Sequence, residues 1–398
     1  MKNYYLTLLL AAGYLLASCG QEKQEPLSDV IERGLNVSAT QALLMAKELE
    51  GQEGRLPKTI KPDGSLQTSS YDWWCCGFFP GELWYLYENN HSPELKKYAE
   101  LYTDRIEPIK MHTNTHDLGF MLFCSFGNGY RIMDNSAYKE VLITGAHSLM
   151  KRYNPAMGLI KSWDFNKEVW QYPVIIDNMM NLELFTWAAR VTSDDAFDKA
   201  ARSHANKTME HHFRPDFSTW HVVSYDTVTG NPHIKQTQQG YADESAWARG
   251  QAWGLYGYTM MYRETGDKAY LNQARHIASF IMSHPNLPKD KVPYWDFNAP
   301  DIPDALRDAS AAAVIASALI ELSGFDTTGF GKQCLTFAEQ QIRSLSSPAY
   351  LAEPGTNAYF TLKHSVGSLP GNSEVDVPLT YADYYYVEAL LRLKKLNR

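Results

Sequence analysis

The spacing of apolar residues is the feature that most restricts the fold of this 398-residue chain. In about twelve segments, apolar side chains recur every three to four residues, the spacing of a helix with one buried face. Gly, Pro and Asx residues separate these segments, and such residues end helices or start new ones. The predicted helices cover 28–50, 78–89, 93–110, 117–129, 135–152, 177–192, 195–212, 244–265, 267–284, 306–323, 331–346 and 378–394.

Short turns join several of these helices, for example residues 192–195 and 264–267. Helices joined by short turns run antiparallel, so the sequence predicts six antiparallel pairs in an all-α fold, an (α/α)6 barrel. An α-solenoid is the competing architecture, but the chain lacks the fixed repeat length of a solenoid.

Five longer irregular stretches, at 51–77, 153–176, 213–243, 285–305 and 347–377, are rich in Trp, Asp, His and Pro. Residues 220–225 within them have the pattern of a short strand. Long loops in a compact domain are usually functional. We expect these loops to gather at one mouth of the barrel.

The N-terminus has the pattern of an export signal. Lys2 precedes an apolar run at 6–16, and Leu16-Ala17-Ser18-Cys19 matches a bacterial lipoprotein box. We therefore expect residues 1–18 to be a lipoprotein signal peptide, Cys19 to be lipidated, 19–27 to be a tether and 28–398 to be a single barrel domain. An ordinary signal peptide with a chance Cys is the alternative. Lipidation would make the protein an exported bacterial lipoprotein, facing the periplasm or on the outer membrane, with a lipid anchor as its sole membrane contact.

Composition narrows the possible partners. The net charge of −8 argues against a nucleic-acid surface. Aromatic residues make up 13% of the chain, with 10 Trp and 25 Tyr, which suits contact with sugar faces. Cys75, Cys76, Cys124 and Cys334 form no regular framework, so we expect buried free thiols.

Two aspartates are the candidate acid–base residues. Asp117 and Asp177 each lie where a predicted helix begins, among apolar neighbours. Poor solvation raises the pKa of a carboxyl group toward neutrality, where it can donate and accept protons. Both could instead be helix N-caps, a position that Asp fills well, and the two roles do not exclude each other.

A metal or cofactor is not expected. His112 and His116 have the spacing of half a zinc site on a helix, but no glutamate follows His112 and no third ligand is evident. The spacing of Gly324 and Gly329 resembles a phosphate loop, but Phe330 stands where a lysine is needed.

Eight segments in unbroken order between residues 70 and 395 resemble a known family. They are Trp-Cys-Cys-Gly-Phe-Phe-Pro-Gly-Glu-Leu-Trp at 74–84, His-Asp-Leu-Gly-Phe at 116–120, Asp-Asn-Met-Met-Asn at 177–181, His-His-Phe-Arg-Pro-Asp at 211–216, Gln-Gly-Tyr at 239–241, Ser-Ala-Trp-Ala-Arg-Gly-Gln-Ala-Trp at 245–253, Pro-Tyr-Trp-Asp-Phe at 293–297 and Tyr-Ala-Asp-Tyr-Tyr at 381–385. The chain is similar to glycoside hydrolase family 88, the unsaturated glucuronyl hydrolases. This resemblance implies an (α/α)6 barrel acting on oligosaccharides that carry a 4,5-unsaturated uronate at the non-reducing end.

The resemblance also implies roles for individual residues. Asp177 matches the family's general acid and base, and Asp117 matches its second essential carboxylate. The residues expected to contact the substrate are Trp74, His116, His221, Gln239, Trp247, Arg249 and Trp253. As bare patterns, Trp247 and Trp253 would equally fit an aromatic helix in a core, and His221 an ordinary strand residue.

The chemistry of the implied reaction agrees with these roles. An enol ether is protonated at carbon, which needs one acid with a raised pKa, and the same residue can then deliver water. Two widely separated carboxylates are therefore not required. Arg249 is expected to pair with the substrate carboxylate in bidentate geometry.

One departure from the family concerns sulfate. Some members read a sulfate with a Ser-x-x-Ser-x-Lys loop, whereas this chain has Ser365 and Ser368 followed by Pro370. A preference for 6-sulfated sugars is therefore not expected, unless Lys363, His364 or Arg214 supplies the cation.

The sequence leaves other functions open. Unsaturated rhamnogalacturonyl hydrolases and sugar epimerases are alternative activities on the same barrel, although an epimerase is expected to depend on histidine pairs. A non-catalytic glycan-binding lipoprotein would need the aromatic residues but not Asp177. Which glycan is preferred, among chondroitin, hyaluronan and heparin-type, does not follow from the sequence, and neither does the oligomeric state.

Overall fold

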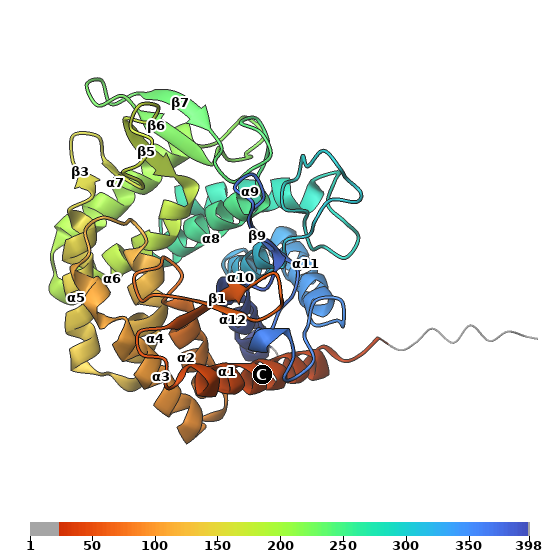
Figure 1. The fold of residues 1–398 in the computed structure, drawn as a ribbon. Coiled ribbons are helices and arrows are strands. Elements are labelled where there is room, and N and C mark those ends of the chain that lie inside the picture. The colour runs from red at the N-terminus through yellow and green to blue at the C-terminus, as the bar shows by residue number, and fades with distance from the viewer. Residues whose placement is uncertain (1–23, 397–398) are drawn as a thin grey trace, which may run out of the picture.

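The computed structural model describes residues 24–396, and within this range the chain forms twelve α-helices in a closed ring. They are α1 (Leu27–Leu49), α2 (Phe78–Asn90), α3 (Pro93–Arg105), α4 (Asn128–Met133), α5 (Ser136–Met150), α6 (Leu182–Thr192), α7 (Asp195–His211), α8 (Ala248–Thr265), α9 (Lys268–Ser283), α10 (Ala309–Phe325), α11 (Gly329–Leu345) and α12 (Thr380–Leu396). Figure 1 shows the chain running once round the ring, and α12 closes it by packing against both α10 and α2. The predicted (α/α)6 barrel is confirmed.

The even-numbered helices form the inner wall and the odd-numbered helices cover it. α10 illustrates an inner helix, because almost every residue of Ala309–Leu322 is buried. A helix that is apolar on all sides is stable only when it is surrounded by protein. The outer helices α5, α7, α9 and α11 begin with polar caps, for example Asp194 and Asp267, whose side chains accept a backbone N–H of the first turn.

Three segments, two of them on the inner wall, differ from the predicted continuous helices. Residues 119–127 form a π-helix, η2 (Gly119–Gly127), before α4, and residues 176–181 form a 3-10 helix, η3 (Ile176–Asn181), before α6. The segment predicted as 93–110 ends its α-helix at Arg105 and continues as η1 (Glu107–Met111), a 3-10 helix that contains Pro108. Proline cannot donate the N–H that an α-helix needs there.

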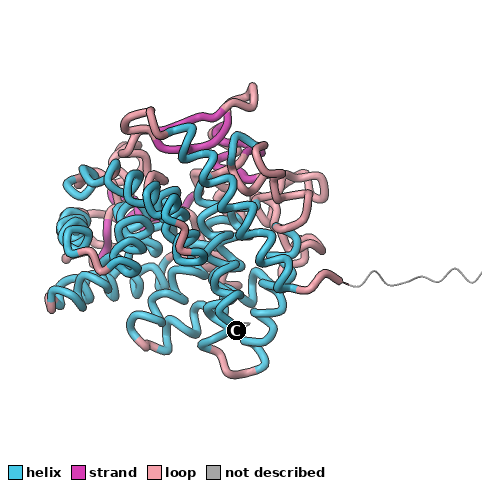
Figure 2. Tube along the Cα trace, turned by 90° about the horizontal axis from the view of Figure 1, so that it is seen from below, coloured by secondary structure: helices cyan, strands magenta, loops and turns pink. Residues whose placement is uncertain are grey.

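The long loops contain more strands than the single one predicted. β5 (Tyr172–Ile175), β6 (Val222–Tyr225) and β7 (Pro232–Gln236) form an antiparallel sheet, with Ile175 opposite Val222. The other strands are paired as two-stranded antiparallel sheets: β1 (Leu56–Ile60) with β2 (Leu66–Ser69), β3 (Tyr153–Asn154) with β4 (Leu159–Ile160), and β8 (Ser365–Ser368) with β9 (Ser373–Val377). Figure 2 shows most strands and long loops toward one end of the barrel, as predicted.

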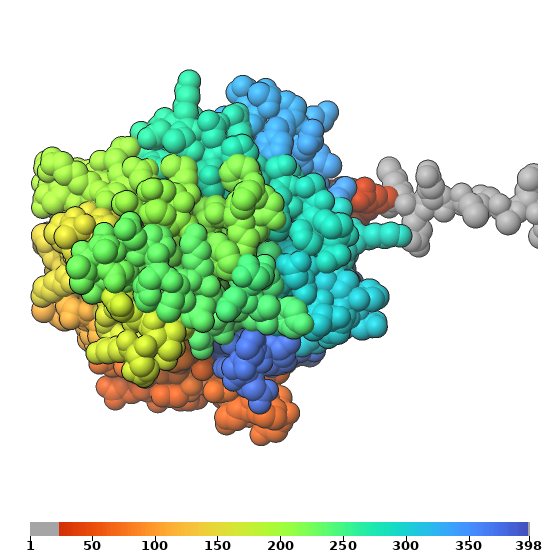
Figure 3. Space-filling model, turned by 90° about the horizontal axis from the view of Figure 1, so that it is seen from above, coloured from red at the N-terminus to blue at the C-terminus, as the bar shows by residue number. Residues whose placement is uncertain are grey.

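Hydrogen bonds join loops that are far apart in the sequence. The Gln239 side chain donates to the carbonyl of Gly367 in β8 over 3.4 Å, and Figure 3 shows the green loop region beside the dark blue β8–β9 hairpin. One hydrophobic core extends from Val30 to Leu393. Cys75, Cys76 and Cys334 are buried free thiols, and Cys124 is half-buried and also free.

Candidate active site

The two candidate acids lie at the start of adjacent inner segments. Asp117 lies two residues before η2, and Asp177 lies in the first turn of η3. The Asn181 side chain accepts the backbone N–H of Phe120 over 2.9 Å, so the two turns are tied together. Neither aspartate caps a helix through its side chain, so the N-cap interpretation is wrong and both carboxyl groups are available for chemistry.

Both carboxyl groups are poorly solvated. Asp117 and Asp177 keep 15% and 13% of their side-chain surface exposed. The pKa of Asp177 is raised to about 7, mainly by burial and also by the charge of Asp117, whereas Arg249 opposes the shift. Burial likewise raises the pKa of Asp117 to about 7, against a 3.0 Å hydrogen bond from Thr115. Each group can therefore exchange a proton near neutral pH.

His221 is brought to Asp177 by the pairing of β5 with β6. Ile175 pairs with Val222, and the next backbone N–H, that of Ile176, donates to the carbonyl of His221 over 3.1 Å. The Nδ1 atom of His221 accepts the backbone N–H groups of Gln238 and Gln239 over 3.1 and 3.3 Å. Burial lowers the pKa of His221 to about 3, so the ring is neutral and its proton must be on Nε2.

That proton points toward Asp177. Nε2 of His221 lies 3.7 Å from Oδ2 of Asp177, too far for a hydrogen bond. Both atoms are buried without a hydrogen-bond partner. Buried polar atoms are nearly always paired, so two orphaned atoms facing each other mark a place for a ligand group.

His116 has a similar relation to the other acid. Its Nε2 atom lies 3.4 Å from Oδ1 of Asp117, and burial lowers the pKa of the ring to about 3. Each acid thus has a neutral imidazole beside it.

Aromatic side chains surround these groups. The rings of Trp247 and His221 are in contact, with centroids 4.5 Å apart and a tilt of 37°, and the ring of half-buried Trp74 lies 5.0 Å from that of Tyr381. Trp253 is fully buried and packs against Phe120. It therefore lies in the aromatic core, which is the alternative that the sequence left open for this residue. Its indole N–H also interacts with Asp177 and lowers the pKa of that carboxyl group, against the larger effect of burial.

Arg249 is more engaged than the sequence suggests. It forms a 3.1 Å ion pair with Asp308, and its two terminal nitrogens donate to the carbonyls of Val366 and Gly367 in β8. The guanidinium is 1% exposed and lies 4.5 Å from the ring centre of Trp247. Arg249 was expected to bind a substrate carboxylate through two parallel hydrogen bonds. Its terminal nitrogens already donate to protein acceptors, so the guanidinium has no free pair of donors for that contact. Arg249 instead holds the β8–β9 hairpin over the site and adds positive charge near Asp177.

Two features of the site were missed from the sequence. Asp308 both pairs with Arg249 and caps α10 by accepting the N–H groups of Ser310 and Ala311. Trp163 presents its edge to His221 at 5.8 Å and packs with Phe165 and Trp170. An Asp before an Ala-rich run signals the cap, and the aromatic density of 153–176 was the signal for the Trp cluster.

The described residues contain no group of three or more His, Cys, Asp or Glu placed to hold a metal ion.

The barrel and its paired carboxyl groups define a helical-barrel enzyme of the acid–base type. A curated "Unsaturated glucuronyl hydrolase" from Formosa agariphila is 44% identical over 399 residues, covering 99% of each chain. The chain therefore belongs to the unsaturated glucuronyl hydrolases, glycoside hydrolase family 88. An "Unsaturated chondroitin disaccharide hydrolase" from Streptococcus pneumoniae is 33% identical, covering 81% of this chain and 82% of its own.

Solved structures agree with this assignment. The crystal structure of an unsaturated glucuronyl hydrolase "specific for heparin" has a TM-score of 0.90 and 47% identity, covering 93% of this chain and 98% of its own. A mutant of the Streptococcus agalactiae enzyme complexed with dGlcA-GalNAc6S has a TM-score of 0.75 and 28% identity, covering 92% of this chain and 91% of its own. No family model matches the chain. The chain is thus an enzyme, and the alternative of a non-catalytic binding protein is wrong.

Proposed function

We propose that this hydrolase removes the 4,5-unsaturated uronate from the non-reducing end of lyase-generated glycosaminoglycan oligosaccharides, with Asp177 as acid and then base. The observation that carries the role of Asp177 is its orphaned Oδ2 atom, 3.7 Å from the orphaned Nε2 of a neutral His221. A hydroxyl or water placed between the two atoms would pair with both.

The steps follow from the protonation states. Neutral Asp177 gives its proton to the carbon of the enol ether double bond, which leaves an oxocarbenium-like centre. Water then adds at that centre and gives a proton to the Asp177 carboxylate, so the residue ends as it began. The product of this addition is a hemiketal, whose ring C–O bond breaks to leave a ketone and a hemiacetal at the anomeric carbon. The hemiacetal collapses to an aldehyde and releases the second sugar with its hydroxyl group restored. Burial, with a smaller contribution from the charge of nearby Asp117, keeps the pKa of Asp177 high enough for the first step. His221 donates through Nε2 and positions the attacked group.

The neutral histidines support hydrolysis over epimerisation. A general base that abstracts a proton from a sugar carbon works best with a pKa near the operating pH. Burial keeps the pKa of both His116 and His221 near 3, whereas the pKa values of Asp117 and Asp177 are about 7.

Replacing Asp177 tests the assignment. Asp177→Asn keeps the shape of the side chain but cannot move a proton, so we expect turnover to fall about 100-fold or more with substrate binding retained. The absorbance of the conjugated double bond of unsaturated disaccharides reports turnover, and calorimetry reports binding. Asp195→Asn, on the exposed surface of α7, is the matched control and should retain the parent rate. An Asp177→Asn enzyme at half the parent rate would contradict the proposal.

Heparin-type oligosaccharides are the substrate class that we favour. This proposal is supported by the 47% identity with the enzyme described as specific for heparin, against 28% for the Streptococcus agalactiae enzyme complexed with dGlcA-GalNAc6S. Parallel kcat/KM measurements on unsaturated disaccharides from heparin-type chains, chondroitin and hyaluronan would decide it. A higher value on chondroitin disaccharides would reverse this preference.

We retain the lipid anchor as part of the proposal. Cys19 and the predicted signal peptide lie outside the described residues. Within residues 24–396, no helix is long and apolar enough to cross a membrane. An acyl chain on Cys19 would place the barrel at a membrane surface behind a short tether. Labelling of the expressed protein with a fatty-acid analogue should succeed in the parent and fail in Cys19→Ala.

A further inference from the structure

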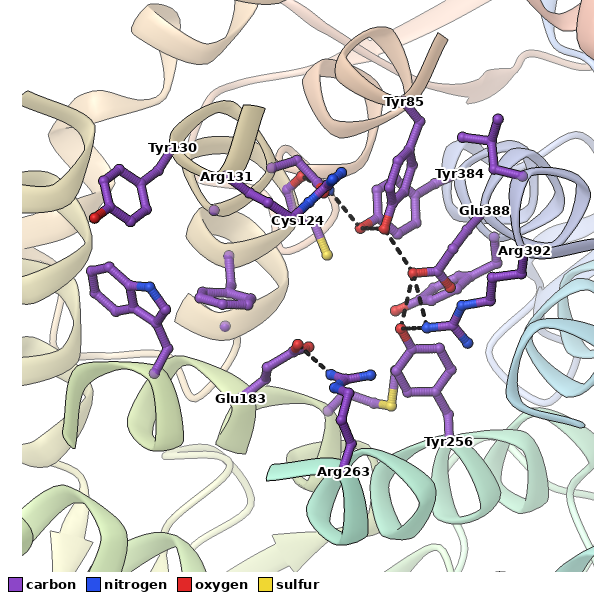
Figure 4. A pocket seen from close by; sticks show the side chains of 18 of the residues that line it. Tyr85, Cys124, Tyr130, Arg131, Glu183, Tyr256, Arg263, Tyr384, Glu388 and Arg392 are labelled. Carbon is purple, nitrogen blue, oxygen red and sulfur yellow. Dashed lines mark hydrogen bonds and ion pairs between the residues drawn. The ribbon is translucent and has the colours of Figure 1, made fainter. Parts of the chain in front are cut away.

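A second cavity lies at the other end of the barrel from the two acids. Its volume is about 480 Å³, and α2, η2, α4, α6, α8 and α12 contribute to its wall. Asp117 and Asp177 precede the inner helices, whereas this cavity is lined by residues further along them, such as Arg131, Arg263 and Arg392. Inner helices of the barrel run in the same direction, so the rear cavity, as we call it, lies behind the acid-bearing turns and reaches them at Gly119 and Met180. Figure 4 shows it from close by.

Charged groups in the rear cavity are paired with one another. Glu388 accepts the hydroxyl protons of Tyr85 and Tyr256 over 2.7 and 3.0 Å and lies 3.4 Å from Arg392. Arg263 forms ion pairs with Glu183, Glu264 and Glu321. The pairing extends to the rim, where Arg131 holds Glu88 with two hydrogen bonds of 2.9 and 2.7 Å. The wall of the cavity therefore presents no unbalanced inner charge to a ligand.

An aromatic wall faces this polar side. Tyr130 and Trp187 make an edge-to-face contact at 5.7 Å, and Phe123 meets Trp187 at 6.1 Å. Tyr130 and Phe123 remain half-buried, so their rings are accessible. Figure 4 shows Tyr130 across the opening from Glu388 and Arg392.

The π-helix η2 gives this wall its shape. Phe123 and Cys124 lie in the middle of η2, and they are its half-buried residues whereas the rest of the segment is mostly buried. A π-helix is wider than an α-helix and occurs frequently at functional sites. Here the wider turn places Phe123 and Cys124 on the lining of the rear cavity.

We propose that the rear cavity binds a neutral saccharide of one or two rings. Pockets of roughly 300–1,000 Å³ with an apolar wall and a few placed polar groups are typical of small-molecule sites. A charged ligand would not gain a free ionic partner, because the charged side chains of the cavity are already paired. A purely apolar ligand would bury the polar atoms of Glu388 and Tyr256 without forming hydrogen bonds to them, which is unfavourable. A sugar ring has an apolar face for Tyr130 and hydroxyl groups for the paired charges.

Binding can be tested with simple neutral glycosides. The probes are methyl β-glucoside and methyl N-acetyl-β-glucosaminide, with methyl β-glucuronide as the charged comparison. We expect saturable binding of a neutral probe in calorimetry or saturation-transfer NMR, weakened about tenfold in Tyr130→Ala because the ring face is lost. Phe123→Ala is the second variant, should Tyr130→Ala fail to fold. Lys199→Glu, on the exposed surface of α7, is the matched control and should leave affinity for the neutral probe unchanged. Lys395→Glu reverses a charge at the rim of the cavity and tests for a charged ligand.

Kinetics separate the two ends of the barrel. A probe in the rear cavity should not compete with an unsaturated disaccharide, and Tyr130→Ala should keep the parent kcat/KM. Competitive inhibition with a constant equal to the dissociation constant would place the probe at the front site and overturn the proposal. The proposal would also be overturned if neither neutral probe showed saturable binding. It would likewise be overturned if the glucuronide bound more tightly than the neutral probes and Lys395→Glu abolished that binding.

Discussion

The chemistry of the site depends on where single carboxyl groups lie. Asp177 and Asp117 have the same side chain as the many surface aspartates, but burial, the largest cause, moves their pKa from the usual range to about 7. A neutral His221 beside Asp177 contributes a hydrogen-bond donor without contributing charge. The site therefore holds a removable proton at neutral pH.

The pH dependence of turnover follows from these values. If protonated Asp177 is the acid, kcat/KM should fall as the pH rises through about 7, because the acid loses its proton. Asp117→Asn removes a charge that raises the pKa of Asp177, so any residual activity should fall at a lower pH than in the parent. A pH–rate profile of each enzyme checks this. A falling limb that stays in place or moves to higher pH would exclude the proposed coupling.

At the scale of elements, two unusual helices position the acids. η2 and η3 approach each other closely at Gly119, where an added Cβ would lie 2.4 Å from Cα of Asn181. Real Cβ atoms do not come so close to backbone, so this glycine is required for the approach. The Asn181–Phe120 hydrogen bond then fixes the spacing of the two turns.

Gly119→Ala should therefore separate the two acid-bearing turns. We expect lower stability and a loss of activity of at least about tenfold, because a small misplacement of catalytic groups is costly. Gly324→Ala in α10 is the matched control: a Cβ there meets nothing within 4 Å, and the change should stabilise slightly, by about 0.5–1 kcal/mol. Thermal unfolding and kcat/KM of both variants measure the effect. If the two variants had the same unfolding temperature and the same kcat/KM, the close approach of η2 and η3 at Gly119 would not matter for stability or activity.

The β8–β9 hairpin bears on sulfate preference. Pro370 lies in its turn and offers no donor, and the Ser368 hydroxyl accepts the N–H of Gly371. The cations considered as replacements are engaged elsewhere. Lys363 donates to the carbonyl of Pro348, His364 pairs with Asp376, and the Arg214 guanidinium donates to the loop carbonyls of Thr219, Asp243 and Ser245.

We therefore expect 6-sulfation of the second sugar to change kcat/KM little. A missing ionic contact corresponds to roughly 1–3 kcal/mol, or about 5- to 150-fold in specificity. Kinetics on unsulfated and 6-sulfated unsaturated chondroitin disaccharides measure the difference. A tenfold preference for the sulfated sugar would point to Lys58, which lies 3.5 Å from Glu374 in β9, and Lys58→Met would then remove it.

At the scale of the whole molecule, the active site has a cost in stability. The pKa of Asp177 is about 7 in the folded protein and 3.8 as its reference value, so the folded state binds more protons between these pH values. The free energy of unfolding then decreases as the pH rises from about 4 to 7 and is constant above, as far as this group is concerned.

Asp177→Asn should remove this cost. The variant should unfold at a higher temperature than the parent at pH 8, by a stability difference on the order of 1–4 kcal/mol, and the difference should shrink toward pH 4. Scanning calorimetry at both pH values gives the difference, and Asp195→Asn again serves as the exposed control. A stability difference between variant and parent that is the same at both pH values would mean that burial does not raise the pKa of Asp177.

The sequence by itself determined the helices and their arrangement. Apolar periodicity predicted eleven of the twelve α-helices, because each helix has to bury a continuous face, whereas the segment predicted at 117–129 is the π-helix η2 and not α4. Short Asx-capped turns such as those at Asp194 and Asp267 made neighbouring helices antiparallel. The motifs also identified Asp117 and Asp177 as the acids to examine. Boundaries were least certain where helices change type, at η1, η2 and η3, since these depend on packing as well as on local propensity.

Only the tertiary structure decided what the individual side chains do. Arg249 looks free on its helix, but it is bound by Asp308 and by carbonyls of β8, which lies 117 and 118 residues further along the chain. His221 meets Asp177 because β5 pairs with β6, and both atoms are left without partners by the folded surroundings. Solvent exclusion, which sets each pKa, is a property of all the segments around a group together. A local pattern cannot contain it, and therefore the sequence names the acids while the barrel gives them their chemistry.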